Sequence, residues 1–217
     1  MVGAALTPGT IIQIYGQNLA SQTTQPTTIP LPTTASGTSV TIGGIPAPLY
    51  YVSAGQINAQ LPFELNPLQP YEIIVSANGA LTTPDTLQVT PATPGLAAFV
   101  DGTLIAQHSD GSLVSASSPA RGGEYLVACL AGMGPTNAEP PSGAASPSSP
   151  LAMPNATPTL TINGVATPIA FAGLTPGLVG LYQMNFQVPT GLAAGDLTLV
   201  VSQNNSPSNT TVLPYQL

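Results

Sequence analysis

Short stretches in which apolar and polar residues alternate run through the whole chain. The clearest covers residues 182–188, where the apolar positions are Tyr182, Met184, Phe186 and Val188, and the amide positions are Gln183, Asn185 and Gln187. Side chains of a strand point alternately to its two faces, so this pattern predicts a β-strand with one apolar and one amide-bearing face. Gly or Pro interrupts most windows of helical length, and the chain is therefore predicted to be all-β.

Three segments of the first half of the chain recur in the same order in the second half. Residues 39–48 match 159–168, residues 56–62 match 183–189, and, more weakly, residues 9–12 match 123–126. Ordered matches of this kind predict an internal duplication. We therefore expect two β-sandwich domains, at residues 1–92 and 123–217. A linking segment at 93–122 is expected between them, with a small hairpin around Asp110-Gly111.

The chain carries very little charge. Charged residues make up 4% of 217 residues, Arg121 is the only basic residue, and the formal net charge is −7. Binding to nucleic acid or attraction to anionic lipid requires several cations, so both partners are excluded. The surface must instead consist of Ser, Thr, Gln, Asn and backbone groups. Such a surface lacks the charge repulsion that keeps monomers apart, which favours association between copies.

Segments that could signal location, modification or redox chemistry are few. No apolar run reaches the length of a membrane-spanning helix, so membrane insertion is not expected, and the residues after Met1 are too few for a secretion signal. Cys129, the single cysteine, lies between apolar neighbours and is expected to be a buried small side chain. Ser21–Ser36 and Asn137–Pro158 are rich in Ser, Thr, Pro and Ala. They are predicted to be exposed loops, with O-linked glycosylation as the alternative.

The titratable residues do not form a catalytic pattern. His108 stands beside Ser109 and Asp110, but neighbouring residues on a strand point to opposite faces and cannot form a triad. We expect His108 to be a solvated turn residue. The acidic residues lack the spacing of zinc or EF-hand sites, and the alternative left open is calcium held between loops by Asp85, Asp101 or Asp196. The sequence predicts no catalytic residue, no cofactor and no metal, so no enzyme.

The strands that carry amides are the candidate contact surface. The adjacent residues Tyr50 and Tyr51 must place one ring on each face, so one ring is expected to be exposed, where it could stack on a sugar. Packing in the core is the alternative for both rings. The candidate assembly or binding surface consists of Gln56, Asn58, Gln60, Gln183, Asn185, Gln187, Tyr50 and Tyr51.

Several motifs resemble known extracellular modules. The Pro-Gly opening with its alternating Ile residues (8–19), the Gly-Gly hairpin (40–49) and residues 56–62 resemble IPT/TIG-type immunoglobulin-like domains. Nearly the whole chain, including 49–58 and 171–185, resembles the repeated C-terminal module of large secreted proteins of Acidobacteria (the Solibacter type). The resemblance implies two tandem immunoglobulin-like β-sandwich domains in an extracellular or cell-surface protein and supplies no catalytic residues. Because only seven residues precede Pro8, the first sandwich is expected to lack a complete first strand.

Two functions are compatible with these features. The first is an extracellular structural subunit that self-assembles into a filament or surface layer, with copies of itself as partners. The alternative is an adhesin or carbohydrate-binding accessory module of a larger secreted protein, with glycans or other surface proteins as partners. Assembly could proceed by donation of a strand to a neighbour, from Val2–Leu6 or from Thr210–Leu217. The alternative for Thr210–Gln216 is that it forms the last strand of its own domain.

Overall fold

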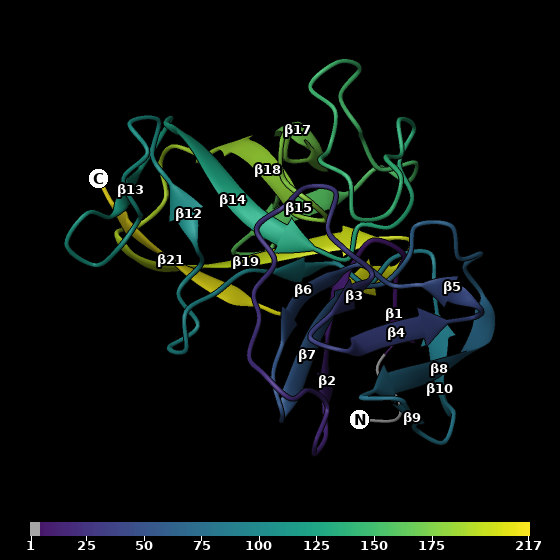
Figure 1. Ribbon diagram of the computed structural model, residues 1–217. Helices are drawn as coiled ribbons and strands as arrows, with labels where there is room; N and C mark the ends of the chain where they lie inside the picture. The colour runs from purple at the N-terminus through teal and green to yellow at the C-terminus, as the bar shows by residue number, and fades with distance from the viewer. Residues whose placement is uncertain (1–4) are drawn as a thin grey trace.

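The computed structural model describes residues 5–217, which fold into two tandem immunoglobulin-like β-sandwiches (Figure 1). This confirms the all-β prediction. Within residues 5–217 there is no α-helix, and accordingly none that is long and apolar enough to span a membrane. In Figure 1 the first sandwich is drawn in purple and blue, and the second in teal, green and yellow.

The first sandwich consists of a larger and a smaller sheet. The larger sheet has the order β1 (Ala5–Leu6), β10 (Asp85–Val89), β8 (Gln69–Ala77), β4 (Thr38–Ile42) and β3 (Thr34–Ala35), with β5 (Ile45–Pro46) on β4 and β9 (Ala80–Leu81) on β8. The smaller sheet has the order β2 (Ile11–Tyr15), β7 (Gln56–Gln60) and β6 (Leu49–Val52). Alternating apolar residues such as Val40, Ile42, Ile57 and Ala59 are fully buried between the two sheets.

The second sandwich repeats this arrangement with additional strands. One sheet has the order β13 (Ala120–Arg121), β21 (Thr211–Gln216), β19 (Gly195–Gln203), β15 (Thr159–Ile162) and β16 (Val165–Thr167), with β20 (Ser206–Pro207) on β19. The other has the order β11 (Gly95–Leu96), β14 (Tyr125–Ala131), β18 (Tyr182–Gln187) and β17 (Ile169–Leu174), with β12 (Ala106–Gln107) on β14. Its core is formed by the apolar alternation of β18 packed against Leu160, Ile162 and Leu199.

The segments that match in sequence occupy equivalent places in the two sandwiches. Gly9 N–H donates to Leu61 O, and Gly123 N–H donates to Val188 O, both at 2.8 Å. The β2–β7–β6 sheet and the sheet that contains β14, β18 and β17 also have a β-bulge at the same position. The register shifts between Leu49 and Tyr51 on β6, and between Ile169 and Phe171 on β17. Residues with the same place in the two registers are called counterparts below.

The segment at 93–122 is part of the second sandwich, not a separate linker. Its strands β11 and β12 both pair with β14, and Leu96, Leu104, Ala106 and Val114 are buried in the second core. The predicted hairpin is present, since Gln107 bridges Leu113. The prediction of a separate linker is wrong because β11 and β12 are too short to show a period of two. Their burial depends on β14, which follows them in sequence.

Both chain ends differ from the strand-donation expectation. Leu6 on β1 pairs in parallel with Val89 on β10, so the first sandwich does have an N-terminal strand, while residues 2–4 of the proposed donor lie outside the described residues. The proposed C-terminal donor is wrong, because β21 pairs with β19 and β13 of its own sandwich. Its apolar residues Leu213 and Tyr215 are already buried there.

Candidate functional site

The outer face of the β2–β7–β6 sheet carries aromatic rings and amides and no charge. Ile12 and Ile57 point into the core, so the alternate residues point outward. Within this face, Tyr15 lies opposite Gln56, and Asn58 lies opposite both Gln13 and Tyr51. The face is defined here by Gln13, Tyr15, Tyr51, Gln56 and Asn58, and is called the ring-amide face.

Hydrogen bonds orient the polar groups of the ring-amide face. Gln56 Nε2 donates to Asn58 Oδ1 at 2.7 Å, and Tyr15 Oη donates to Gln13 Oε1 at 2.7 Å. The Tyr15 residue is 63% exposed. The face therefore offers aromatic rings beside pre-oriented amides, which can both donate and accept hydrogen bonds.

The sequence predicts three of the five residues of this face. These are Gln56, Asn58 and Tyr51, whereas Gln13 and Tyr15 are not among the predicted contact residues. The signal that could have found them is the alternation of apolar Ile12 and Ile14 with Gln13 and Tyr15. The equivalent strand in the second half of the chain carries no amide, so the match between the two halves does not mark Gln13.

Gln60 and Tyr50, both predicted for the contact surface, lie in the junction between the sandwiches. Gln60 is fully buried, and its Oε1 accepts a hydrogen bond from Gly143 N–H at 2.6 Å. Tyr50 is the bulged residue of β6, and its hydroxyl donates to Val179 O. Burial raises the pKa of the Tyr50 hydroxyl. The expectation that Gln60 is exposed is thus wrong, because the second sandwich covers this end of β7.

A loop predicted to be exposed supplies much of this junction. Ser142 Oγ accepts a hydrogen bond from Phe63 N–H at 2.8 Å and donates to Glu64 Oε2 at 2.6 Å. Partial burial by itself raises the pKa of Glu64, but the hydrogen bonds from Ser142 Oγ and N–H outweigh it, and the net pKa is lowered. Phe63 packs in the core of the second sandwich. Part of the loop at Asn137–Pro158 therefore packs in the contact between the two sandwiches and is not exposed.

The equivalent face of the second sandwich has a different composition. Gln183, Asn185 and Gln187 lie on the outer side of β18 as predicted from alternation, and Gln183 Nε2 donates to Asn185 Oδ1 at 3.3 Å. Their neighbours on β14 are Cys129 and Val127, the counterparts of Tyr15 and Gln13. The second face therefore has Cys129 and Val127 where the first has Tyr15 and Gln13, and its exposed tyrosine is Tyr125, opposite Gln187.

Cys129 is half-buried on this second face, not in the core. Its free thiol is on the outer side of β14, opposite Gln183. Burial raises the pKa of the thiol. A raised pKa lowers the thiolate fraction at neutral pH, and the thiolate is the reactive form of the side chain.

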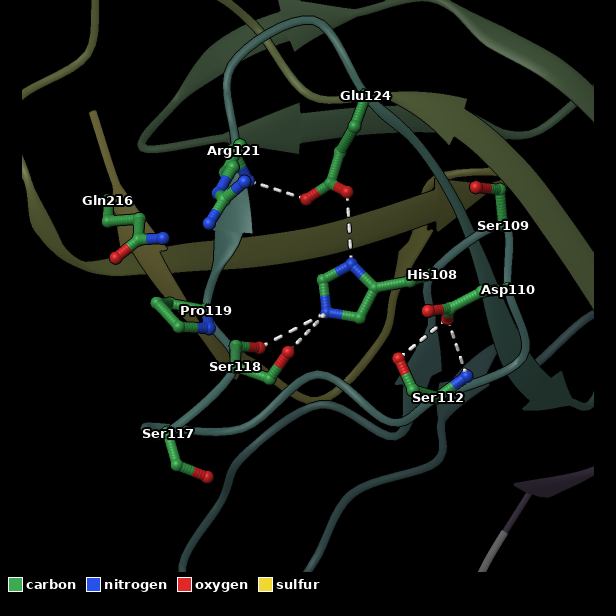
Figure 2. A pocket seen from close by; sticks show the side chains of 10 residues that line it. All are labelled: His108, Ser109, Asp110, Ser112, Ser117, Ser118, Pro119, Arg121, Glu124 and Gln216. Carbon is green, nitrogen blue, oxygen red and sulfur yellow. Dashed lines mark hydrogen bonds and ion pairs between the residues drawn. The ribbon is translucent and has the colours of Figure 1, made fainter.

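A polar cavity of about 350 Å³ surrounds the only histidine of the chain (Figure 2). His108 Nδ1 lies 3.0 Å from Glu124 Oε2, and Nε2 lies 3.1 Å from Ser118 O. Both neighbours are acceptors, so the doubly protonated ring satisfies both. The pKa of His108 is raised chiefly by the hydrogen bond to Glu124, which outweighs the lowering by burial, and the Ser118 carbonyl raises it further by a smaller amount.

The geometry of this cavity does not make a hydrolytic triad. Asp110 Oδ1 accepts hydrogen bonds from Ser112 N–H and Oγ, and none of the hydrogen bonds drawn in Figure 2 joins its carboxylate to the imidazole. The His108 side chain is 12% exposed, so the expectation of a solvated turn residue is wrong. The ring is covered because Glu124 and Ser118 come from separate loops that local sequence does not bring together.

Two of the three acidic residues considered for calcium accept hydrogen bonds from residues one or two positions further along the chain. Asp85 Oδ1 accepts from Thr86 N–H at 2.8 Å, and Asp101 Oδ1 accepts from Thr103 N–H at 2.9 Å. Asp85 and Asp196 belong to different sandwiches. In residues 5–217 no three His, Cys, Asp or Glu side chains are grouped so that they could hold a metal ion.

Comparisons with known proteins identify the type of domain. The family model of the IPT/TIG domain matches residues 2–90, which make up less than half of the chain. The first sandwich is thus similar to IPT/TIG domains, in agreement with the motifs of its sequence. A search of curated proteins found no match.

Several solved structures resemble this chain at low sequence identity and low TM-score. One is SGBP-B of the Bacteroides ovatus mixed-linkage glucan utilization locus, in complex with a mixed-linkage heptasaccharide, at 14% identity and a TM-score of 0.38. The match covers 98% of this chain and 42% of SGBP-B. Others are tandem immunoglobulin domains of titin (10% identity, 98% and 90% coverage, TM-score 0.28) and surface layer protein SbsC (9%, 84% and 22%, 0.25).

Proposed function

We propose that this chain is a non-catalytic, carbohydrate-binding module of an extracellular or cell-surface protein. The observation that carries the proposal is the ring-amide face, where the exposed Tyr15 ring stands beside Gln13 and Gln56. Aromatic rings stack on the apolar C–H faces of sugars, while amides donate to and accept from neighbouring hydroxyls. The expected ligand is a neutral glycan, because the face carries no cation to pair with an acidic sugar.

The comparison between the two sandwiches supports the assignment to the first one. We infer that the sandwiches are two copies of one module, since their bulges and Gly9/Gly123 hydrogen bonds coincide. The second copy has Cys129 at the place of Tyr15. The place of the Tyr15 ring therefore has no aromatic ring in the second copy, whose exposed Tyr125 lies at another position of the face, opposite Gln187.

Binding to a panel of neutral soluble polysaccharides, measured by affinity electrophoresis and titration calorimetry, tests the proposal. We expect Tyr15→Ala to weaken binding roughly tenfold, since a stacked ring contributes about 1 kcal/mol or more. The matched control is Tyr125→Ala, which removes a 54% exposed ring from the second sandwich and should leave affinity unchanged. No binding to any neutral glycan, or equal losses for both variants, would contradict the proposal.

Self-assembly into a filament or surface layer stays a prediction. Its support is the near-absence of charge, which removes repulsion between copies. Negative-stain electron microscopy of the purified chain distinguishes filaments from monomers.

A further inference from the structure

The outer edge of β14 is covered by an earlier segment of the same chain. Gly95 pairs with Ala131, Ala97 N–H donates to Cys129 O at 2.9 Å, and Gln107 pairs with Val127. In Figure 1, β12 of this segment lies beside β14. The backbone groups that β14 turns away from β18 are therefore hydrogen-bonded.

The same segment also reaches the opposite sheet. Leu104 N–H donates to Val212 O at 2.7 Å, and Val212 N–H donates to Gly102 O at 2.9 Å. The segment at 95–114 thus closes one side of the second sandwich, from β14 to β21. Its apolar residues Leu96, Leu104, Ala106 and Val114 fill that side of the core.

The corresponding side of the first sandwich is open within residues 5–217. β2 is the last strand of its sheet and pairs with β7 alone. Thr10 O accepts from Leu61 N–H and Gly16 N–H donates to Gly55 O, so the even-numbered residues of β2 hydrogen-bond to β7. The backbone groups of Ile11, Gln13 and Tyr15 point away from β7 and form a free edge. These residues are the counterparts of Tyr125, Val127 and Cys129 on the covered edge of β14.

Core residues next to the open side are less buried than their counterparts. Ile73 lies opposite Ile42, as Leu199 lies opposite Ile162, and Leu87 is likewise the counterpart of Leu213. Leu199 and Leu213 are fully buried, whereas Ile73 and Leu87 are only partly buried. The first core thus lacks the apolar cover that the second one has.

We propose that the open side of the first sandwich, between β2 and the edge of the larger sheet where β1 pairs with β10, is a docking groove for an extended chain segment. The occupant is a segment with the apolar pattern of residues 95–114, donated by another module of this kind. It would pair with the free edge of β2 and cover Ile73 and Leu87, as residues 95–114 do for their counterparts. Main-chain hydrogen bonds would supply affinity, and the alternate apolar side chains would supply specificity.

A synthetic peptide of residues 93–116, labelled and titrated into the full-length chain, tests this proposal by fluorescence anisotropy. We expect saturable binding, and slower hydrogen exchange at the amides of Gln13 and Tyr15. A peptide with Leu96→Ser and Leu104→Ser removes two apolar anchors and should bind at least roughly tenfold more weakly.

Two variants of one residue locate the contact. Gln13→Pro removes the outward N–H of β2 without touching a β7 hydrogen bond, and Gln13→Ala keeps it. We expect roughly tenfold weaker peptide binding for Gln13→Pro and unchanged binding for Gln13→Ala. The peptide docks elsewhere if both variants bind alike, or if protection appears only in the second sandwich.

Two further outcomes also overturn the proposal. Absence of binding by the peptide excludes this occupant. Self-association of the chain that Gln13→Pro abolishes, without peptide binding, would identify a second copy as the occupant of the edge. Glycan affinity is measured separately, so failure of the docking groove and failure of the carbohydrate-binding assignment are distinguishable.

Discussion

Gln60 of the first sandwich accepts a hydrogen bond from the N–H of Gly143 in the second sandwich, across a buried contact of 2.6 Å. Its counterpart Gln187 is exposed and has no such partner among the described hydrogen bonds. Each glutamine also donates from Nε2 to an equivalent carbonyl, Gly9 O for Gln60 and Gly123 O for Gln187. The two glutamines therefore differ in one respect, which is that only Gln60 also accepts a hydrogen bond from the other sandwich.

Replacing Gln60 by Leu is expected to lower the free energy of unfolding by about 1–3 kcal/mol, because it leaves the buried Gly143 N–H without an acceptor. Chemical denaturation measures this loss. Gln187→Leu is the matched control, and as a surface change it should cost about 0.5 kcal/mol or less. Similar losses at the two positions would contradict a special role of the junction.

Gly180 is predicted to be intolerant of a side chain. Its φ is +67°, and an added Cβ would lie 2.6 Å from Gly9 O and 3.0 Å from Gln60 Nε2. Gly177, with φ +79°, has open space around the same position. Gly180→Ala should therefore destabilise the chain by at least about 1 kcal/mol more than Gly177→Ala, which bears only the backbone strain. Thermal unfolding of the two variants checks the difference.

Asn209 is predicted to hold the covering segment on the second sandwich. Its Oδ1 accepts from Leu96 N–H at 2.8 Å, and its Nδ2 donates to Leu96 O at 3.0 Å. Asn209→Ala should cost about 1–2 kcal/mol and speed hydrogen exchange at the Leu96 amide. Asn209→Asp keeps the acceptor and loses the donor, so an intermediate effect is expected. Unchanged protection of Leu96 in Asn209→Ala would refute the assignment.

The pair of His108 and Glu124 predicts a defined dependence on pH. The pKa of His108 is raised in the folded state, chiefly by Glu124. The stability that this pair contributes is fully present below the unfolded value of about 6.5 and is lost as pH rises through the folded pKa. Glu124→Gln should bring the pKa of His108 back toward about 6.5, as measured by NMR titration.

The control for this titration is Asp110→Asn. The Asp110 carboxylate is bound to Ser112 and makes the smallest contribution to the raised pKa of His108. It should therefore shift that pKa far less than Glu124→Gln. The stability difference between Glu124→Gln and the parent chain should shrink as pH rises from below about 6.5 through the raised pKa of His108. A difference that grows over this range would have the wrong sign.

The apolar face of each matched strand follows from the amino-acid sequence alone. Residues such as Ile57 and Met184 alternate with amides, and the period of two places them in the core whatever the rest of the chain does. The turn pairs Gly43-Gly44 and Asn163-Gly164 likewise have positive φ, as two-residue hairpins require. These features are local, so a short window of sequence contains all of their causes.

Which amides stay exposed to solvent depends on the tertiary structure and cannot be predicted from the alternation alone. Gln60 continues the alternation of Asn58, yet it is buried because Gly143, 83 residues further along the chain, docks on it. The assignment of residues 93–122 to the second sandwich depends in the same way on β14, and the cover of His108 depends on Glu124. Such contacts join segments whose own sequence patterns are too short or too polar to predict which segment they pack against. Their burial therefore follows from packing between distant parts of the chain.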